Sequence, residues 1–386
     1  MENQKRSQTE VIPVVPIVRK NAKDSTQNTG KHAKPDTGKN SISEAVAFWK
    51  KLPVSEGRYE LLEPIGRGGM GIVYQAKDGF LNRRVAIKIM LPDKDKNDLR
   101  LSRFLQEARI HSQLQHPGIP SLHDIGQFSD GRAFIAMEFC RGTLLADMLE
   151  DRSDHFTGLS YYLELFEKIC QTIAYAQSKG VSHRDLKPTN VLVSKFGQIH
   201  VIDWGLATIN EDSSNDKANS QSESHLPTPG TAQVELNTLF ETSEGDALGS
   251  ANFVAPEQAK GEIGASQFRR DVFGLGALLC VILTGTPPFT GSPTVVWTKA
   301  RLGSLNEAID RLNSCGAPEP LVELAIQCLS TDPDERPADA GVVAEAINRY
   351  RSEVISRDIA KISSVLDGQP KKSGWFNPIS RLFKQD

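Results

Sequence analysis

Two kinds of hydrophobic spacing follow one another along the chain from Arg58 onward, and they predict two different lobes. In the first part, short apolar runs bounded by glycine and polar residues predict strands, and Leu101–Leu114 predicts a single helix among them. The predicted strands span residues 59–65, 72–76, 84–89, 119–126 and 133–139. After Gly142 the spacing is mainly helical, over residues 144–151, 161–179, 271–283 and several stretches between 292 and 350. The pattern therefore predicts a small strand-rich lobe followed by a larger helical lobe.

Three segments fall outside this pattern. Residues 1–45 are rich in polar residues and glycine and cannot bury enough apolar surface to offset the entropy of ordering, so we expect them to be disordered. Residues 211–246 have a similar composition and predict a solvated insertion. Residues 352–386 form a tail whose last part can dock on a membrane surface or a partner, or pack back onto its own domain. That amphipathic stretch contains Trp375, Phe376, Ile379, Leu382 and Phe383.

Composition indicates the compartment and the classes of partner, but it does not indicate a reaction. The net charge of -3 gives no general attraction to nucleic acid or to a membrane surface, and we expect neither as a partner of the folded part. The five cysteines form no C-x-x-C pair, which favours reduced thiols over a disulfide framework or a zinc site. The longest apolar stretch, Val272–Thr284, is shorter than the roughly 20 residues that span a bilayer and predicts a buried helix. We therefore expect a cytoplasmic protein without a transmembrane segment.

A glycine-rich turn joins the first two predicted strands. The stretch Ile65-Gly-Arg-Gly-Gly-Met-Gly-Ile-Val73 has glycines where backbone can approach phosphate oxygens closely, because no Cβ obstructs them. A dinucleotide-binding fold would continue as a helix, whereas this chain continues as a strand. Tight hairpins also collect glycine, so the turn alone leaves open both a phosphate-binding loop and a plain hairpin.

Lys88 lies in an otherwise apolar strand, in the run Val85-Ala-Ile-Lys88. A charge in a buried strand is costly without a partner, and Glu107 on the predicted helix can supply one. The alternative is a lysine at a strand edge whose head group reaches solvent. The glycine turn and this lysine together favour a binding role.

The most informative stretch is His183-Arg-Asp-Leu-Lys-Pro-Thr-Asn190, followed by Asp203-Trp-Gly. Asp185 can orient a substrate hydroxyl and accept its proton. Lys187, two residues on, can neutralise charge on a phosphoryl group in transfer. Asn190 and Asp203 flank a short predicted hairpin and carry the oxygen ligands that Mg²⁺ prefers. This order of groups predicts a phosphoryl-transfer site.

With these motifs the chain resembles the eukaryotic-type Ser/Thr protein kinases, most closely their bacterial branch, over residues 58–351. Ala255-Pro-Glu257 matches the end of the family's activation segment, and Arg336 matches the arginine that pairs with that glutamate. Asp271 matches the buried aspartate beneath the catalytic loop. Met137-Glu-Phe-Cys140 resembles the hinge that meets adenine, with Met137 as gatekeeper.

The resemblance implies a two-lobed α+β protein kinase fold, with an antiparallel-sheet N-lobe at 58–138 and a mainly helical C-lobe at 142–351. It implies that Asp185, Lys187 and Asn190 are catalytic, and that Asn190 and Asp203 hold Mg²⁺ or Mn²⁺. Lys88, held by Glu107, would bind the α- and β-phosphates of ATP. The implied nucleotide-binding residues are Ile65, Gly66, Arg67, Gly68, Gly69, Met70, Gly71, Val73, Ala86, Lys88, Glu107, Met137, Glu138, Cys140 and Leu192.

The implied reaction is transfer of the γ-phosphate of ATP to Ser or Thr hydroxyls of protein substrates, with autophosphorylation and a signalling role. Serine/threonine specificity rests on Lys187 and on Gly249-Ser250, which resembles the Gly-Thr of the family's substrate loop. A pseudokinase would lack one of the catalytic groups. A kinase for small molecules would lack Ala-Pro-Glu and its arginine partner.

The chain departs from the family pattern at two points. Trp204 stands where phenylalanine is usual, and we expect it to fill the same apolar site. The segment from Asp203 to Glu257 is unusually long. We expect it to regulate activity through an anion that pairs with Arg184, next to Asp185. The alternative is a solvated loop without a role, since long loops cost little entropy. The candidate anions are a phosphate on Thr242 or Ser243 and the built-in acids Glu244 and Asp246.

Overall fold

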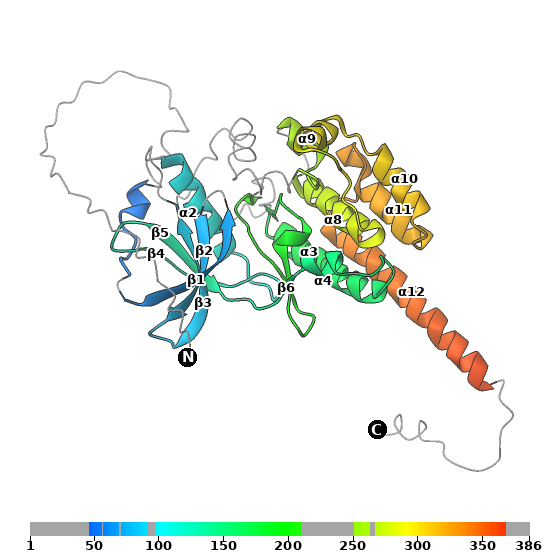
Figure 1. The fold of residues 1–386 in the computed structure, drawn as a ribbon, viewed down its shortest axis with the longest axis horizontal. Helices are drawn as coiled ribbons and strands as arrows, with labels where there is room; N and C mark the ends of the chain where they lie inside the picture. The colour runs from blue at the N-terminus through cyan, green and yellow to red at the C-terminus, as the bar shows by residue number, and fades with distance from the viewer. Residues whose placement is uncertain are drawn as a thin grey trace, which may run out of the picture.

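The computed structural model describes residues 46–55, 57–68, 71–91, 98–209, 251–262 and 267–367, and these form two lobes (Figure 1). The sheet lobe, in blue and cyan, and the helical lobe, in green to orange, are joined by the chain after residue 138. The extension 1–45, the insertion 211–246, the loop residues 249–250 and the amphipathic tail all lie outside the described residues. Their predicted properties stay predictions.

The N-lobe is a five-stranded antiparallel sheet in the order β1-β2-β3-β5-β4, with helix α2 (Asp98–Ser112) beside it. Its strands are β1 (Tyr59–Gly68), β2 (Gly71–Asp78), β3 (Arg83–Met90), β4 (Leu122–Gln127) and β5 (Ala133–Glu138). Alternate residues of β5 enter two core clusters: Ile135 packs with Phe104 of α2, and Phe134 packs with Ile87 of β3. Because strand side chains alternate between faces, Lys88 points to the α2 side.

The C-lobe is built around α8 (Gln267–Thr284), which is buried at every residue from Arg270 to Thr284. An apolar surface all round is what a central helix needs, because neighbours cover every side. Helices α4, α11 and α12 pack directly against it. The helices of this lobe are α3 (Leu145–Glu150), α4 (Leu159–Ser178), α7 (Pro256–Lys260), α8, α9 (Pro293–Leu302), α10 (Asn306–Ser314), α11 (Glu319–Cys328) and α12 (Ala340–Asp367).

Short strands carry the loops that face the N-lobe. Strands β6 (Thr143–Leu144), β8 (Val191–Val193) and β9 (Ile199–Val201) form one small sheet, and β7 (Val181–Ser182) pairs with β10 (Thr208–Ile209). A 3-10 turn, η1 (Pro188–Asn190), precedes β8, and a second, η3 (Pro333–Glu335), precedes α12. The loop after β7 and the loop after β9 therefore emerge side by side beneath the sheet lobe.

The predicted fold class is confirmed, but helix ends differ by one to three residues at α2, α3 and α4 and by more at α8 and α12. Helix α8 begins at Gln267 and not at Asp271, because its first turn is polar and adds nothing to the apolar pattern. Helix α12 continues to Asp367, well past the predicted end near Tyr350. This extension has no glycine or proline, contains pairs such as Arg357 Nη2 to Glu353 Oε2 at 3.2 Å, and projects beyond the lobe (Figure 1).

Candidate active site

A cavity of about 1400 Å³ lies between the two lobes. Every residue predicted for the site lines this cavity, apart from Gly69 and Met70, which lie outside the described residues. Ile65, Val73 and Ala86 line it from the sheet lobe and Leu192 lines it from the helical lobe. An apolar slot between two surfaces fits a flat aromatic ring such as adenine.

Two glycines of the β1–β2 turn differ in the space around the position of a Cβ atom. A Cβ at Gly71 would lie 2.4 Å from the carbonyl oxygen of Ile89, so strand packing alone requires glycine there. A Cβ at Gly68 would meet nothing within 4 Å. Since Gly68 lines the cavity, the open space above it is room for a ligand to approach the backbone.

Lys88 is held by two carboxylates. Its Nζ donates to both oxygens of Glu107, at 2.7 and 2.8 Å, and lies 3.6 Å from Oδ1 of Asp203. Burial alone would lower the pKa of Lys88, but the charges of Glu107 and Asp203 outweigh it and raise that pKa, so the amine stays charged. Burial raises the pKa of Glu107. The pair places a fixed positive charge in the wall of the cavity.

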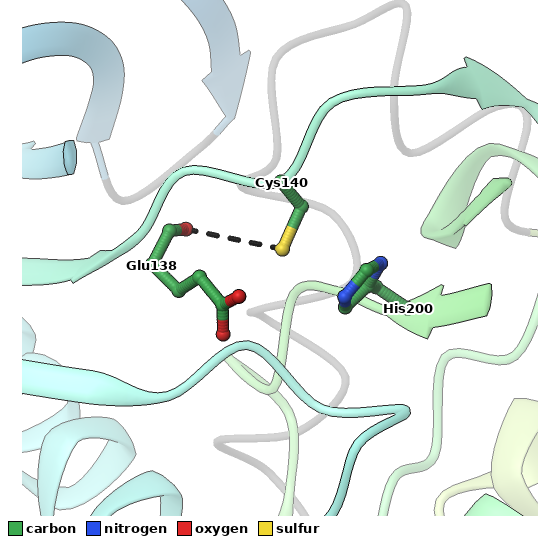
Figure 2. A group of neighbouring side chains, drawn as sticks. All are labelled: Glu138, Cys140 and His200. Carbon is green, nitrogen blue, oxygen red and sulfur yellow. Dashed lines mark hydrogen bonds between the residues drawn. The ribbon is translucent and has the colours of Figure 1, made fainter. Parts of the chain in front are cut away.

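The chain between the lobes forms the edge of the cavity. Met137 lies near the end of β5, paired with Ala86 of β3. The side chains of Glu138 and Cys140 lie next to each other beyond it, and Cys140 Sγ is 4.0 Å from the carbonyl oxygen of Glu138 (Figure 2). The predicted hinge residues therefore all lie at the cavity.

The loop after β7 brings three functional groups together. Lys187 Nζ lies 2.9 Å from Oδ2 of Asp185. Asn190 Nδ2 donates to Oδ2 of Asp185 at 3.0 Å and to the carbonyl oxygen of Asp185 at 2.8 Å. The Asn190 amide is thereby oriented, and its oxygen is left as an acceptor.

A buried carboxylate supports this loop from below. Asp271 of α8 is 1% exposed and accepts hydrogen bonds from the backbone N–H groups of His183, at 3.0 Å, and Arg184, at 2.8 Å. Arg184 has a φ of +68°, in the left-handed region that costs energy for a non-glycine residue. The two hydrogen bonds stabilise that backbone and fix the direction of the next residue, Asp185.

Asp203 and Trp204 follow β9. Asp203 also has a positive φ, +63°, and its side chain lines the cavity with about half of its surface exposed. Desolvation would raise the pKa of Asp203, but the charges of Lys88 and Lys187 together with a hydrogen bond from the Gly205 N–H hold it below its ordinary value. An ionised, accessible carboxylate and the amide oxygen of Asn190 line the same cavity, and such oxygens suit a divalent cation.

Trp204 is 1% exposed and belongs to the main core, with Ile110 at the end of α2. Its Nε1 donates to the carbonyl oxygen of Val201 at 3.1 Å, and its ring meets the His183 ring edge-on with centroids 4.6 Å apart. The larger aromatic ring therefore packs as the predicted apolar residue, with its one polar atom satisfied.

A model of the protein kinase domain matches residues 59–349. The chain belongs to the protein kinase family. It is 31% identical over 319 residues to the serine/threonine-protein kinase PknD of Chlamydia muridarum, covering 78% of this chain and 33% of that protein. It is 31% identical over 356 residues to PknD of Protochlamydia amoebophila, covering 89% and 32%. It is 31% identical over 280 residues to the serine/threonine-protein kinase PrkC of Bacillus subtilis, covering 72% and 38%.

The chain thus spans about a third of the length of these relatives. Membership of the family implies the use of ATP and a divalent metal ion. The apolar slot, the charge on Lys88 and the oxygens of Asn190 and Asp203 fit those two ligands. In the described part of the chain, every helix is too short or too polar to cross a lipid bilayer.

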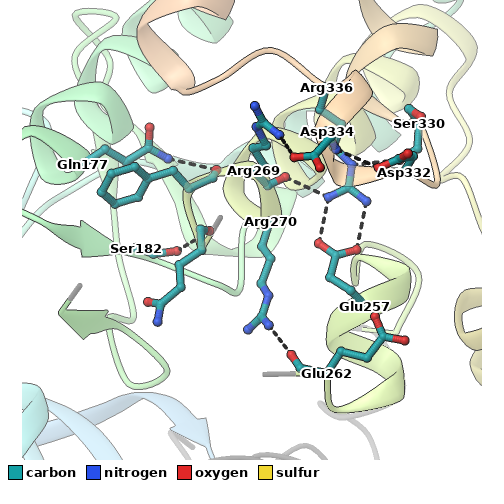
Figure 3. Close-up of polar contacts among 12 residues, drawn as sticks. Gln177, Ser182, Glu257, Glu262, Arg269, Arg270, Ser330, Asp332, Asp334 and Arg336 are labelled. Atoms are coloured by element: carbon teal, nitrogen blue, oxygen red, sulfur yellow. Dashed lines mark hydrogen bonds and ion pairs between the residues drawn. The ribbon is translucent and has the colours of Figure 1, made fainter. Parts of the chain in front are cut away.

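The kinase domain's activation segment is anchored at its far end. Arg336 Nη1 and Nη2 donate to the two carboxylate oxygens of Glu257, at 2.8 and 2.9 Å, in a buried bidentate pair (Figure 3). Arg336 Nε also donates to the carbonyl oxygen of Ser330 at 2.8 Å. Nearby, Arg270 reaches from α8 to the backbone carbonyl of Glu262. Figure 3 shows the pair linking α7 to the segment before α12.

Two supporting residues are missing from the sequence-based set. The side-chain amide of Gln177 in α4 makes both bonds: Nε2 donates to Asp271 Oδ2 at 3.3 Å, and Oε1 accepts the backbone N–H of Ala340 at 2.8 Å. Gln258 of α7 donates to the carbonyl oxygen of Arg184 at 3.0 Å. The sequence shows only that Gln177 is a polar residue on the buried face of a predicted helix. That observation does not indicate which residue it contacts.

Proposed function

We propose that this chain is a serine/threonine protein kinase that transfers the γ-phosphate of ATP to hydroxyl groups of protein substrates. One observation carries the proposal: a single cleft gathers the Lys88–Glu107 pair, Asp185 with Lys187 and Asn190, and the carboxylate of Asp203. These are the groups that phosphoryl transfer needs for positioning and for charge stabilisation. The names of the relatives in bacteria support the same activity.

Mg²⁺ is the metal that this donor set favours. Asn190 and Asp203 offer two oxygen ligands, and Mg²⁺ commonly takes few protein ligands while keeping several waters. When bound, the ion supplies positive charge against the phosphates of the nucleotide. The glycine turn from Gly66 to Gly71 covers the phosphates, and Lys88 binds two of them.

Asp185 orients the substrate hydroxyl and takes its proton. As the new bond from the hydroxyl oxygen to the γ-phosphorus forms, the bond from that phosphorus to the bridging oxygen of ADP breaks. Lys187, 2.9 Å from Asp185, lies where it can donate to the phosphoryl group during transfer. The Asp271 hydrogen bonds fix the loop that carries both groups.

Phosphate transfer from radiolabelled ATP to a generic basic protein, and to the chain itself, tests the proposal. We expect transfer by the parent chain, on serine and threonine by phosphoamino-acid analysis, and none by Lys88→Met or Asp185→Asn proteins with unchanged thermal unfolding. Transfer that survives in Asp185→Asn, with contamination excluded, would refute the mechanism. No transfer by the parent would favour a pseudokinase, and transfer to aminoglycosides alone would favour a small-molecule kinase.

Two further proposals concern the location of the protein and docking through its C-terminal tail. All five cysteines are free thiols, which supports a reducing compartment, and we place the protein in the cytoplasm. Docking through the C-terminal tail concerns residues outside the described part of the chain. Liposome co-sedimentation of the full chain and of a truncation after Asp367 tests it, and equal partitioning would exclude a membrane role.

A further inference from the structure

Three side chains of different chemistry meet beside the hinge. Glu138 and Cys140 come from the hinge and His200 comes from β9 of the C-lobe, and their side chains converge in Figure 2. One potential ligand atom from each residue lies within 4.8 Å of the other two. The fold makes this cluster, because His200 is far from the other two residues in sequence.

His200 is built into the protein without a partner for one of its ring nitrogens. The residue is 5% exposed, and its Nδ1 is buried with no hydrogen bond among the described residues. Leaving a buried polar atom without a hydrogen bond destabilises the fold, so such an atom calls for a partner. A buried imidazole nitrogen is also a common zinc ligand.

The other two side chains have capacity left for a ligand. Glu138 Oε2 accepts the backbone N–H of Ser121 at 3.2 Å, which positions the carboxylate and leaves its second oxygen available. Within the described residues, no ion pair engages Glu138. Among the described residues, the thiol of Cys140 has one hydrogen bond, to the carbonyl oxygen of Glu138 at 4.0 Å, which is at the outer limit for sulfur.

We propose that Glu138, Cys140 and His200 bind a zinc ion beside the hinge. Zinc takes thiolate, imidazole and carboxylate ligands with bonds of about 2.0–2.3 Å, so tetrahedral ligand atoms lie roughly 3.5 Å apart. Rotation of the exposed Glu138 and half-buried Cys140 side chains toward His200 closes the remaining difference. Three protein ligands leave the fourth position to water. Cys140 loses its proton on binding.

This site is chemically distinct from the site proposed for Mg²⁺. Sulfur and imidazole ligands select zinc over Mg²⁺, whereas the oxygens of Asn190 and Asp203 suit a hard cation. The proposal rests on the geometry of the three side chains and does not depend on kinase activity. The site uses a single cysteine. The absence of a C-x-x-C pair in the sequence therefore could not indicate it.

Metal titration of the full-length chain tests the proposal. The protein is stripped with chelator, and zinc affinity is then measured by competition with a chromophoric chelator in excess Mg²⁺, which fills oxygen sites. We expect one zinc per chain, and a thiolate-to-metal charge-transfer band when Co²⁺ replaces zinc. Cys140→Ser and His200→Gln should each weaken zinc binding by about 100-fold or more, since even supporting residues of zinc sites contribute 10–100-fold.

A matched cysteine provides the control. Cys315 is half-buried like Cys140 and lies away from the hinge, so Cys315→Ser should keep the parent affinity. His200 is buried, and the thermal unfolding of its variant is measured alongside; Cys140→Ser keeps the test independent of that outcome. Zinc binding that is absent, that is unchanged in Cys140→Ser, or that gives no charge-transfer band with Co²⁺ would overturn the proposal.

Discussion

Lys88 touches two carboxylates, and their roles can be separated. Glu107→Gln removes one charge but leaves Asp203, 3.6 Å from Nζ, so Lys88 stays in the cleft with a partner. We expect nucleotide affinity to change by no more than about threefold while kcat falls about 100-fold, because a misplaced lysine costs alignment in the transition state. Fluorescent-nucleotide titration and initial rates measure the two effects. Equal losses in both would contradict a positioning role for Glu107.

A buried histidine gives stability a dependence on pH. His111 of α2 is 5% exposed, and its Nε2 lies 2.6 Å from the carbonyl oxygen of Pro120. Burial lowers the pKa of His111 below its ordinary value of 6.5, and the charge of Lys88 adds to this. Above pH 6.5, His111 is neutral in both the folded and the unfolded chain, so its contribution to the free energy of unfolding is fully present.

As the pH falls below 6.5, the unfolded chain binds a proton at His111 that the folded chain excludes. Stability should therefore fall by up to about 1.4 kcal/mol per pH unit from this residue, until the lowered pKa is passed. Urea unfolding at pH 7.5, 6.5 and 5.5 measures the slope, and His111→Gln should flatten it. A variant with the parent's slope would show that other groups dominate.

Residues that belong to a motif could be predicted, including the distant pairs Lys88–Glu107 and Glu257–Arg336, whereas contacts that no motif marks could not. Asp185, Lys187 and Asn190 lie within one loop, so their order alone indicates their proximity. His200 meets Glu138 and Cys140 only because β9 folds beneath the hinge. Nothing in the spacing of these three residues predicts that contact.

At the scale of elements, the Glu257–Arg336 pair ties α7 to the segment before α12. Arg336 is 3% exposed and Glu257 is 8% exposed, so removing one partner leaves a charge in a low-dielectric site. Arg336→Met should lower the free energy of unfolding by about 3–5 kcal/mol. Urea denaturation measures it. The double variant Glu257→Gln, Arg336→Met should recover part of the loss, and a single-variant loss below about 1 kcal/mol would contradict the argument.

Element type followed from periodicity, whereas element ends did not. Strands β3 and β5 read as short apolar runs, and both faces of β5 meet a core cluster. The start of α8 and the end of α12 carry no such signal, because they are polar or exposed. Periodic buried residues indicate the part of a helix that packs on the core. Beyond that part, a helix continues because its residues favour helical backbone.

At the scale of the whole molecule, the question is where the kinase domain ends. Arg351 of α12 forms ion pairs with another helix: it pairs with Glu167 of α4 and reaches Glu164 at 3.8 Å. Beyond it, the pairs Arg357–Glu353 and Lys361–Asp358 lie within α12. Ile355 and Ile359 are 56% and 62% exposed there. Packing therefore stops near Arg351 although the helix continues.

Truncation separates packing from helix length. Removing all residues after Ser356 should change the free energy of unfolding by less than about 1 kcal/mol, because the side chains described there, at residues 357–361, belong to no core cluster. Arg351→Ala in the full chain should cost more, about 1.5–3 kcal/mol, because it removes charge-assisted bonds to a buried glutamate. Urea unfolding of the two proteins compares them directly. A truncated chain less stable than Arg351→Ala would mean that the projecting half of α12 belongs to the folded domain.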